Sequence, residues 1–219
     1  MPVPLKIDFV SDVACPWCAV GLASLGQALE HSRDAVRATL HFQPFELNPD
    51  MPPEGEDLSE HLTRKYGSTP AQQAQIQATI RERGAAVGFA FSPDGRGRIV
   101  NTFNAHRLLH WAGLEGADHQ RALKRALLEA YHGRGERVDH DEVLLAAVHA
   151  AGLDAARARA ILAGDEYAAE VRAAEREWLE AGIRSVPAVV INDRHLISGG
   201  QSPEVFERAL RQIAAQGAG

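Results

Sequence analysis

Cysteine is scarce in this chain. Two occur among the 219 residues, Cys15 and Cys18, three positions apart. A secreted domain held together by disulfides needs more cysteines at wider spacings, so the sequence excludes that class. In a reducing compartment, an isolated C-x-x-C pair indicates redox catalysis or metal binding.

Long apolar runs and clusters of basic residues are absent as well. No stretch approaches the ~20 apolar residues that a membrane span needs. No run of Lys or Arg stands out in a chain of formal net charge −6 and pI about 5.9. We therefore expect neither a membrane nor a nucleic acid as a partner. The first residues, MPVPLK, lack the basic start and apolar core of a secretory signal, so we expect a cytoplasmic protein.

Alternating apolar and polar residues predict strands near the start of the chain. Residues 5–10 (LKIDFV) and 36–43 (VRATLHFQ) have strand patterns. Between them, the apolar spacing over residues 15–30 predicts a helix. A strand, a helix and a second strand in this order indicate a parallel βαβ unit.

The middle of the chain has a different pattern. Residues 48–182 show helical spacing and no convincing strand, and strand signals return at 188–191 and 195–197 before a final helix. The sequence therefore predicts an α/β fold interrupted by a large all-helical insertion. We expect the α/β domain to comprise 1–47 plus 183–219, with the inserted helical domain between them.

The Cys15-Pro16-Trp17-Cys18 motif stands at the expected start of the first helix. The free N–H groups and partial positive charge of a helix N-terminus stabilise a thiolate. We expect Cys15, nearest that end, to be the exposed nucleophile and Cys18 to be the buried resolving thiol. Pro16 suits a first helical turn and stiffens the loop. We expect Trp17 to contact substrates.

Two other interpretations of the cysteine pair remain. A structural zinc site needs four ligands, and the chain has no second C-x-x-C. His106 and His110 have i, i+4 spacing, but they lie in an amphipathic stretch. A pair of inert buried cysteines would leave the intervening Pro-Trp unexplained. We expect no metal and no organic cofactor, with a reversible Cys15–Cys18 disulfide as the redox centre.

A proline precedes the strand expected at 188–191. The Val186–Pro187 bond is a candidate cis peptide, because X-Pro bonds adopt cis at modest cost. Placed beside Cys15, these two residues would offer free backbone to an extended substrate. An ordinary trans proline that opens a strand is the alternative.

Asp8 lies seven residues before Cys15 in an otherwise apolar strand. A buried carboxylate there would have a raised pKa and would shuttle the proton of Cys18. A solvated aspartate at a strand end, or one bonded to backbone, is the alternative. Asp12 competes for the proton role, although we expect it to cap the turn.

Three segments carry more specific motifs: DFVSDVACPWCAVG at 8–21, NTFNAHRLLHWAG at 101–113 and ISGGQSPEVFE at 197–207. With SVPAVVI before the final hairpin, they resemble the DsbA-type branch of the thioredoxin superfamily, most closely its cytosolic FrnE-like members. The resemblance covers nearly the whole chain. It implies a thioredoxin-like fold with a helical insertion, Cys15 as nucleophile, Cys18 as resolving thiol and Pro187 as the cis-proline.

The resemblance implies an enzyme that exchanges disulfides with thiol- or disulfide-containing proteins or small thiols. Kappa-class glutathione transferases and 2-hydroxychromene-2-carboxylate isomerases share this superfamily and bind glutathione. A glutathione-dependent transferase or isomerase is therefore the alternative, and glutathione is a candidate co-substrate. Those relatives usually carry serine at the position of Cys15, so the two cysteines here favour dithiol chemistry. Whether the protein forms a homodimer stays open.

A third hypothesis is a non-catalytic module that binds a partner in a groove of the helical domain. Asn101, Asn104, His106 and Arg107 are candidates to line such a groove. The alternative, which we favour, is that these side chains cap helices and form hydrogen bonds between them.

Overall fold

The chain begins with two parallel strands joined by a helix. We analysed a computed structural model, which describes residues 1–217. Strands β1 (Val3–Ser11) and β2 (Val36–Pro44) pair in parallel along their full length, and α1 (Pro16–His31) connects them. The predicted βαβ unit is confirmed.

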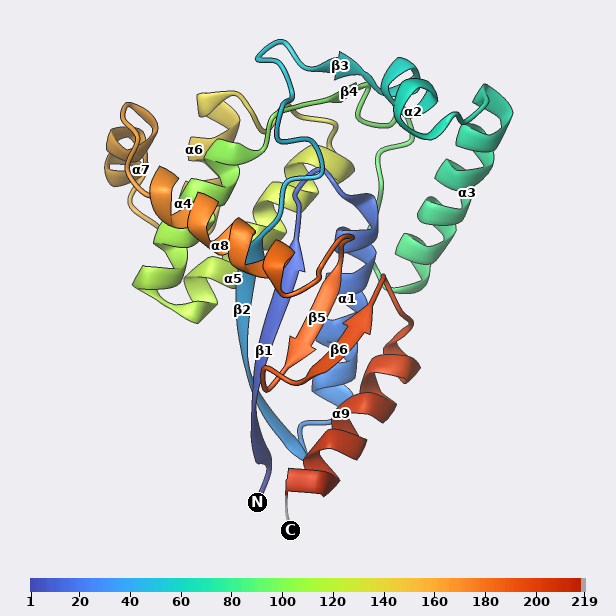
Figure 1. The fold of residues 1–219 in the computed structure, drawn as a ribbon, viewed down its shortest axis with the longest axis vertical. Coiled ribbons are helices and arrows are strands. Elements are labelled where there is room, and N and C mark those ends of the chain that lie inside the picture. Colours follow the sequence, from blue (N-terminus) through green and yellow to red (C-terminus); the bar gives the residue numbers. More distant parts are fainter. Residues whose placement is uncertain (218–219) are drawn as a thin grey trace.

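The end of the chain completes the sheet. Strand β5 (Ala188–Ile191) pairs antiparallel with β1, and β6 (His195–Ser198) pairs antiparallel with β5. The strand order is β2-β1-β5-β6, and α9 (Pro203–Gly217) follows. Figure 1 shows both chain ends at the end of the molecule opposite α2 and the β3–β4 pair.

Helices occupy most of the chain between β2 and β5. They are α2 (Leu58–Tyr66), α3 (Pro70–Ala86), α4 (Phe103–Glu115), α5 (Ala117–Leu128), the π-helical turn η1 (Glu129–Gly133), α6 (Asp141–Ala150), α7 (Ala155–Leu162) and α8 (Ala168–Glu180). The predicted α/β fold with a large helical insertion is thus confirmed. No helix in the described part of the chain is long and apolar enough to cross a membrane.

The expectation of no strand within this region is wrong. Strands β3 (Glu56–Asp57) and β4 (Arg98–Ile99) form a small antiparallel sheet. Each has two residues, which is too short for the alternating pattern that reveals a strand in sequence. Residues 218 and 219, which the expected segment 183–219 includes, lie outside the described residues.

Two large apolar clusters fill most of the interior, beside a smaller third cluster that contains Val10 and Phe45. The first joins the sheet to α1 and α9 and includes Ile7, Phe9, Leu25, Val189, Phe206 and both cysteines. The second lies among α4 to α7 and includes Leu108, Leu123, Leu144 and Ile161, together with Val13 and Ala14. The C-x-x-C motif therefore stands where the two clusters meet, because the two residues that precede it belong to the other core.

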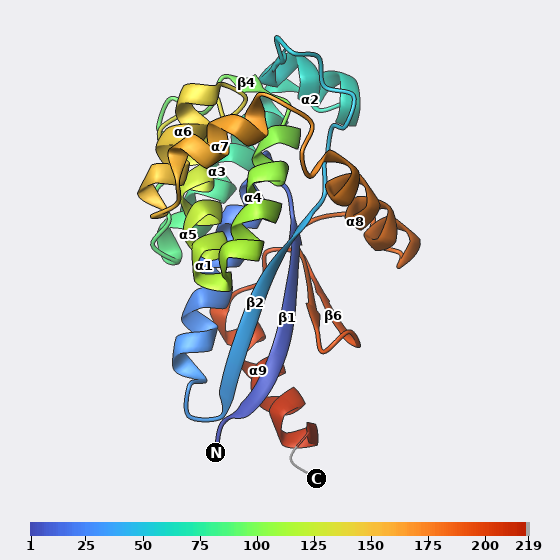
Figure 2. The same cartoon turned by 90° about the vertical axis from the view of Figure 1, so that its left-hand side faces the viewer.

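The helix α5 is tied to the edge strand β2. Figure 2 shows α1 and α5 on one side of the sheet and α8 on the other. From α5, Gln120 Oε1 accepts from the backbone N–H of Phe42 at 2.9 Å, and Nε2 donates to the carbonyl of Phe42 at 3.1 Å. Unpaired backbone groups on an edge strand invite pairing with another chain. The Gln120 amide satisfies both groups of Phe42 and holds α5 against the sheet.

Candidate active site

The two cysteines stand at the first turn of α1. Cys15 is the N-cap residue, with extended backbone (φ −88°, ψ 114°), and Pro16 is the first residue of the helix. Proline suits this position because its missing N–H would have no partner there. The N–H of Cys18 donates to the carbonyl of Cys15 at 3.1 Å, and both thiols are free. The local sequence thus places both sulfurs at a helix N-terminus, as predicted.

Cys15 is less accessible than expected. Its exposed fraction is 4%, and that of Cys18 is 0%. The expectation of an exposed nucleophile is therefore wrong in this conformation. Cys15 Sγ lies 3.6 Å from the carbonyl oxygen of Val186, and the partly buried side chains of Trp17 and Val186 pack in the same cluster. The position of Cys15 at a helix start could not reveal that Val186 would shield its sulfur from solvent, because Val186 lies far away in the sequence.

The surroundings displace the pKa values of the two thiols in opposite directions. A hydrogen bond from the Cys18 thiol is the main cause of a lowered pKa for Cys15; burial opposes it, and backbone N–H groups reinforce it. Burial raises the pKa of Cys18 well above its ordinary value, and the neighbouring Cys15 sulfur raises it further. An ionised nucleophile beside a protonated resolving thiol is the arrangement that disulfide exchange requires.

The segment ahead of β5 packs directly on the start of α1. Its Val186–Pro187 peptide bond is cis. A Cβ atom at Gly21 would come within 3.1 Å of Pro187 Cγ, and one at Gly200 within 3.0 Å of the Trp17 carbonyl oxygen. The two glycines thus permit a close approach that larger residues would prevent. The structure brings this segment and the C-x-x-C motif together.

Asp8 does not lie beside the thiols, contrary to the role we expected for it. Its strand neighbour Phe9 packs in the cluster that contains Cys18, and successive side chains of a strand point to opposite faces of the sheet. On the other face, the Asp8 carboxylate lies 3.1 Å from Lys6 Nζ and accepts from Gln43 Nε2 at 2.6 Å. Strand periodicity identified β1 but could not tell which face would carry the cysteines.

Asp12 is the buried carboxylate of the site. Oδ1 accepts from the N–H of Ala14 at 3.0 Å and from Thr102 Oγ1 at 2.8 Å, and Oδ2 accepts from the N–H of Leu47 at 2.7 Å. His106 Nε2 lies 3.5 Å from Oδ1. Burial alone would raise the pKa of Asp12, but His106 and the backbone hydrogen bonds lower it to about 2. Asp12 caps the turn before the C-x-x-C motif, as predicted, and stays ionised.

Two residues of the helical region hold the backbone just ahead of Cys15. His132 Nε2 donates to the carbonyl of Val13 at 2.8 Å. Arg96 Nη1 donates to the carbonyl of Ala14 at 2.9 Å and to His132 Nδ1 at 3.1 Å. Burial lowers the pKa of His132 well below its ordinary value, which keeps the imidazole neutral, as this pattern requires. The sequence alone assigned no role at the site to either residue: it indicated a solvated connector at 132–137 and a turn at 92–98, because both segments are rich in glycine and charge.

Asn101 does not line the cavity that His106 lines. Asn101 Oδ1 accepts from the N–H of Phe103 at 2.9 Å, and its amide nitrogen donates to the carbonyl of Met51 at 3.4 Å. His106 is buried and lines a cavity of ≈ 270 Å³ between β2, α4 and α5. The hydrogen bonds of Asn101 fit the structural alternative. So do those of Arg107, which donates to three backbone carbonyls and to Asn104.

Sequence reasoning also missed Lys124 of α5, which lines the same cavity as His106. Its side chain has an exposed fraction of 0%, and Nζ has no hydrogen-bond partner among residues 1–217. Burial lowers the pKa of Lys124, while the neighbouring charges of Cys18 and Asp12 oppose that effect. A lysine on the inward face of an amphipathic helix is the one sequence signal that points to it.

The described residues offer no set of zinc ligands at this site. Within the residues that the structure describes, no group of three or more His, Cys, Asp or Glu side chains could hold a metal ion. Both cysteines pack among apolar side chains. The ring of His110 lies against Tyr167, with 5.2 Å between the ring centroids.

Comparisons with known proteins agree with this geometry. The family of DSBA-like thioredoxin domains matches residues 6–211. A probable DsbA oxidoreductase from Streptomyces coelicolor is 35% identical, with a TM-score of 0.87, covering 96% of this chain and 90% of that one. The uncharacterized protein YwbO of Bacillus subtilis (strain 168) is 24% identical over 211 residues, 96% of each chain. The cytosolic disulfide reductase DsbM from Pseudomonas aeruginosa, solved with GSH, shares the fold at 16% identity and a TM-score of 0.66. The match covers 96% of this chain and 99% of that one.

These findings confirm the resemblance that the motifs indicated, and they support a disulfide oxidoreductase or isomerase. The matched range contains both cysteines and the Val186–Pro187 bond. The chain belongs to the family of DSBA-like thioredoxin domains.

Proposed function

We propose that the protein is a thiol–disulfide oxidoreductase that exchanges disulfides with protein or small-thiol substrates through Cys15 and Cys18. The observation that carries this proposal is the pair of free thiols at one helix N-terminus with the pKa of Cys15 lowered and that of Cys18 raised. Family membership supports it.

The exchange has two steps. The Cys15 thiolate attacks one sulfur of a substrate disulfide, so that a mixed disulfide forms and the other substrate sulfur leaves as a thiolate. Cys18 then loses its proton and attacks the Cys15 sulfur; the Cys15–Cys18 bond forms and the second substrate sulfur leaves. Two electrons pass from the dithiol to the substrate, and the reverse sequence oxidises a substrate dithiol.

The segment ahead of β5 supports substrate binding beside Cys15. The Cys15 thiol donates to the carbonyl of Val186 in the structure described here. Ionisation of the thiol removes that donor and frees the carbonyl to accept an N–H from an extended substrate, as in strand addition. Trp17 and Pro187 flank this position, so the proposal assigns substrate contacts to both, with Pro16 stiffening the loop.

Trapping of the mixed disulfide tests the proposal. With oxidised glutathione or a disulfide-bonded peptide, Cys18→Ser should accumulate a mixed disulfide at Cys15, detected by intact mass. The wild type should end with a Cys15–Cys18 disulfide, and Cys15→Ser should trap far less. A wild-type protein that forms neither species, or equal trapping by the two variants, would contradict it.

A second candidate function is a glutathione-dependent transferase or isomerase, in which Cys15 only orients the sulfur of glutathione. The observation that favours it is the fold shared with a solved 2-hydroxychromene-2-carboxylate isomerase, at 16% identity and a TM-score of 0.72 over 97% of this chain and 98% of that one. The same variants separate the two functions, because a transferase or isomerase would keep turning over when Cys18 is replaced by serine. The cytoplasmic location and the use of glutathione as co-substrate remain predictions.

A further inference from the structure

One face of α5 packs against β2 and against the apolar cluster that contains both cysteines. Gln120, Lys124 and Leu128 follow one another at intervals of four, so their side chains lie in a row along the helix. Gln120 is bonded to the backbone of β2, and Leu128 packs in the cluster that contains Cys15 and Cys18. Lys124 stands between these two anchors, on the side of α5 that faces β2 and the cluster containing the cysteines.

The ammonium group of Lys124 is buried without a partner in the part of the protein that the structure describes. An isolated charge in an apolar interior is strongly unfavourable, so a buried lysine either gives up its proton or pairs with an anion. Burial lowers the pKa of Lys124, and the ionised forms of Cys18 and Asp12 raise it. The group is thus able to change its protonation state in response to the charge on Cys18.

Other titratable groups surround Lys124: Cys15, Cys18, Asp12, His106, His132, and His41 and His110 of the cavity wall. Asp12 accepts from the backbone N–H of Ala14 and Leu47 and from the hydroxyl of Thr102, and its pKa of about 2 leaves it ionised. Both ring nitrogens of His132 are occupied, and His106 faces Asp12. Among residues 1–217, His106 Nε2 and Lys124 Nζ are both buried without a hydrogen bond, but His106 Nε2 lies 3.5 Å from the Asp12 carboxylate. Lys124 is therefore the group of this set whose buried proton-binding atom has neither a hydrogen bond nor a carboxylate at ion-pair distance.

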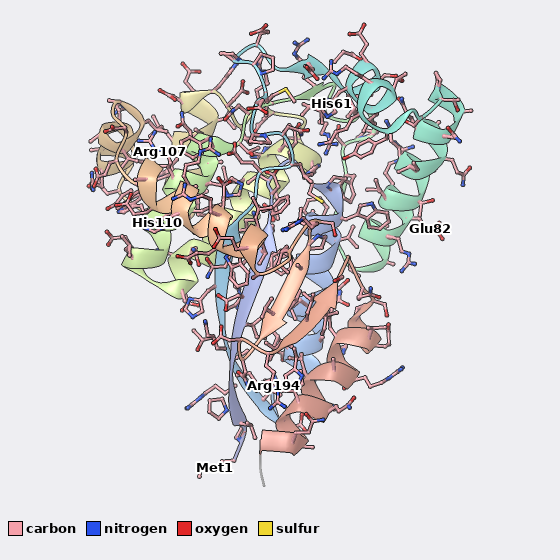
Figure 3. All side chains as sticks on the ribbon, viewed as in Figure 1. Met1, His61, Glu82, Arg107, His110 and Arg194 are labelled. Carbon is pink, nitrogen blue, oxygen red and sulfur yellow. The ribbon has the colours of Figure 1, made fainter. Side chains whose placement is uncertain are left out.

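We propose that Lys124 accepts the proton of Cys18 when Cys18 attacks the mixed disulfide, a role that rests on the proposed function and takes the place expected for Asp8. As the Cys15–Cys18 bond forms, the proton passes from Cys18 Sγ to Lys124 Nζ and the substrate sulfur leaves with its electron pair. Lys124 then releases the proton to water through the cavity that it lines. This cavity reaches the surface at Leu114, which is 65% exposed and lies on the same helix as His110, labelled in Figure 3.

Stopped-flow reaction of the full-length protein with dithiobis(nitrobenzoate) tests this role, because it separates the two thiols in one trace. Attack by Cys15 releases the first thionitrobenzoate, and attack by Cys18 on the resulting mixed disulfide releases the second. In Lys124→Met, the second phase should slow about 10- to 100-fold at pH 7, and its pH midpoint should rise by about one to two pH units. The first phase should change far less.

Two matched variants separate proton transfer from packing. Arg125→Met alters the neighbouring exposed residue of α5 and should leave both phases unchanged. Lys124→Arg keeps a positive charge but cannot take up a proton at working pH, so it should restore the second phase only in part. Methionine fills the space of lysine, so a purely structural role predicts wild-type kinetics in Lys124→Met.

An unchanged second phase in a folded Lys124→Met variant would overturn the inference. Near-UV circular dichroism checks the fold, and Lys124→Gln, which also lacks a titrating amine, replaces the methionine variant should that one unfold. Failure of the proposed function is a different result, since the wild type would then release no second thionitrobenzoate at all.

Discussion

Cys15 Sγ and the carbonyl oxygen of Val186 lie 3.6 Å apart although 171 positions separate the two residues in sequence. The contact joins the start of α1 to the segment that leads into β5. The site is therefore assembled from both ends of the chain. Residues of the helical region then fix the loop before Cys15 through the carbonyls of Val13 and Ala14.

This close packing predicts a specific sensitivity at Gly200. A Cβ atom there would lie 3.0 Å from the carbonyl oxygen of Trp17, which stands between the cysteines in the first turn of α1. Gly200→Ala should therefore lower the free energy of unfolding by about 1 kcal/mol and change the alkylation rate of Cys15, because this turn must shift. Urea denaturation and iodoacetamide kinetics measure the two effects.

Gly26 in α1 is the matched control, since nothing lies within 4 Å of a Cβ atom built there. Gly26→Ala should raise the free energy of unfolding by about 0.5–1 kcal/mol, because alanine favours the helix. Equal effects from the two substitutions would show that packing against Trp17 is unimportant.

Short-range patterns in the sequence were enough to predict much of the fold and the pair of redox cysteines. Alternation over residues 36–43 and the apolar spacing over 15–30 identified β2 and α1, because burial of one face imposes those periods on the sequence. The spacing of Cys15 and Cys18 at a helix start identified the redox pair for a similar reason, since the chemistry is local.

Features that depend on distant packing could not be predicted in the same way. The face of β1 that carries Asp8 is decided by where α1 packs, and two-residue strands such as β3 leave no period to detect. Lys124, His132 and Arg96 reach the site only because α5, η1 and the loop before β4 converge on one turn. Each looked like an ordinary polar residue of a helix or a loop.

Asp12 should make the free energy of unfolding depend on pH in the acid range. Burial acting alone would raise its pKa, but His106 and backbone hydrogen bonds lower it from an ordinary value of 3.8 to about 2. A depressed carboxyl pKa contributes stability above pH 3.8 that is lost as pH falls toward 2, here about 2 kcal/mol. Asp12→Asn should remove this dependence and also destabilise the protein at pH 7, as urea unfolding across pH would show. Asp50→Asn, at an exposed position, should retain the wild-type slope.

Glu46 should have the opposite pH dependence. Burial raises its pKa from 4.5 to about 7, the Glu175 carboxylate adds to this, and Arg172 opposes it. The folded protein thus holds a proton that the unfolded chain has released, so the free energy of unfolding should fall as pH rises from 4.5 to 7. After allowance for solvent screening, we expect a loss of about 1–2 kcal/mol.

Glu46→Gln should abolish that loss and make the protein more stable than wild type at pH 8. Arg172 keeps a partner in the variant, because its Nη1 also lies 2.9 Å from Glu175 Oε2. Thermal unfolding at pH 5 and pH 8 measures the effect. A variant less stable than wild type at both pH values would show that the ion pair with Arg172 outweighs the burial of the charge.

The ionisation of Cys15 should depend on the donor at position 18. The largest cause of its lowered pKa is the hydrogen bond from the Cys18 thiol. Cys18→Ala removes that donor, so the midpoint for Cys15 alkylation should rise by about one pH unit and the rate at pH 7 should fall several-fold. Cys18→Ser keeps an O–H donor at the same place and should hold the midpoint near that of the wild type. Iodoacetamide rates against pH compare the variants. A shared midpoint for the alanine and serine variants would assign the ionisation to the helix N-terminus alone, because the backbone N–H groups of α1 are the same in both.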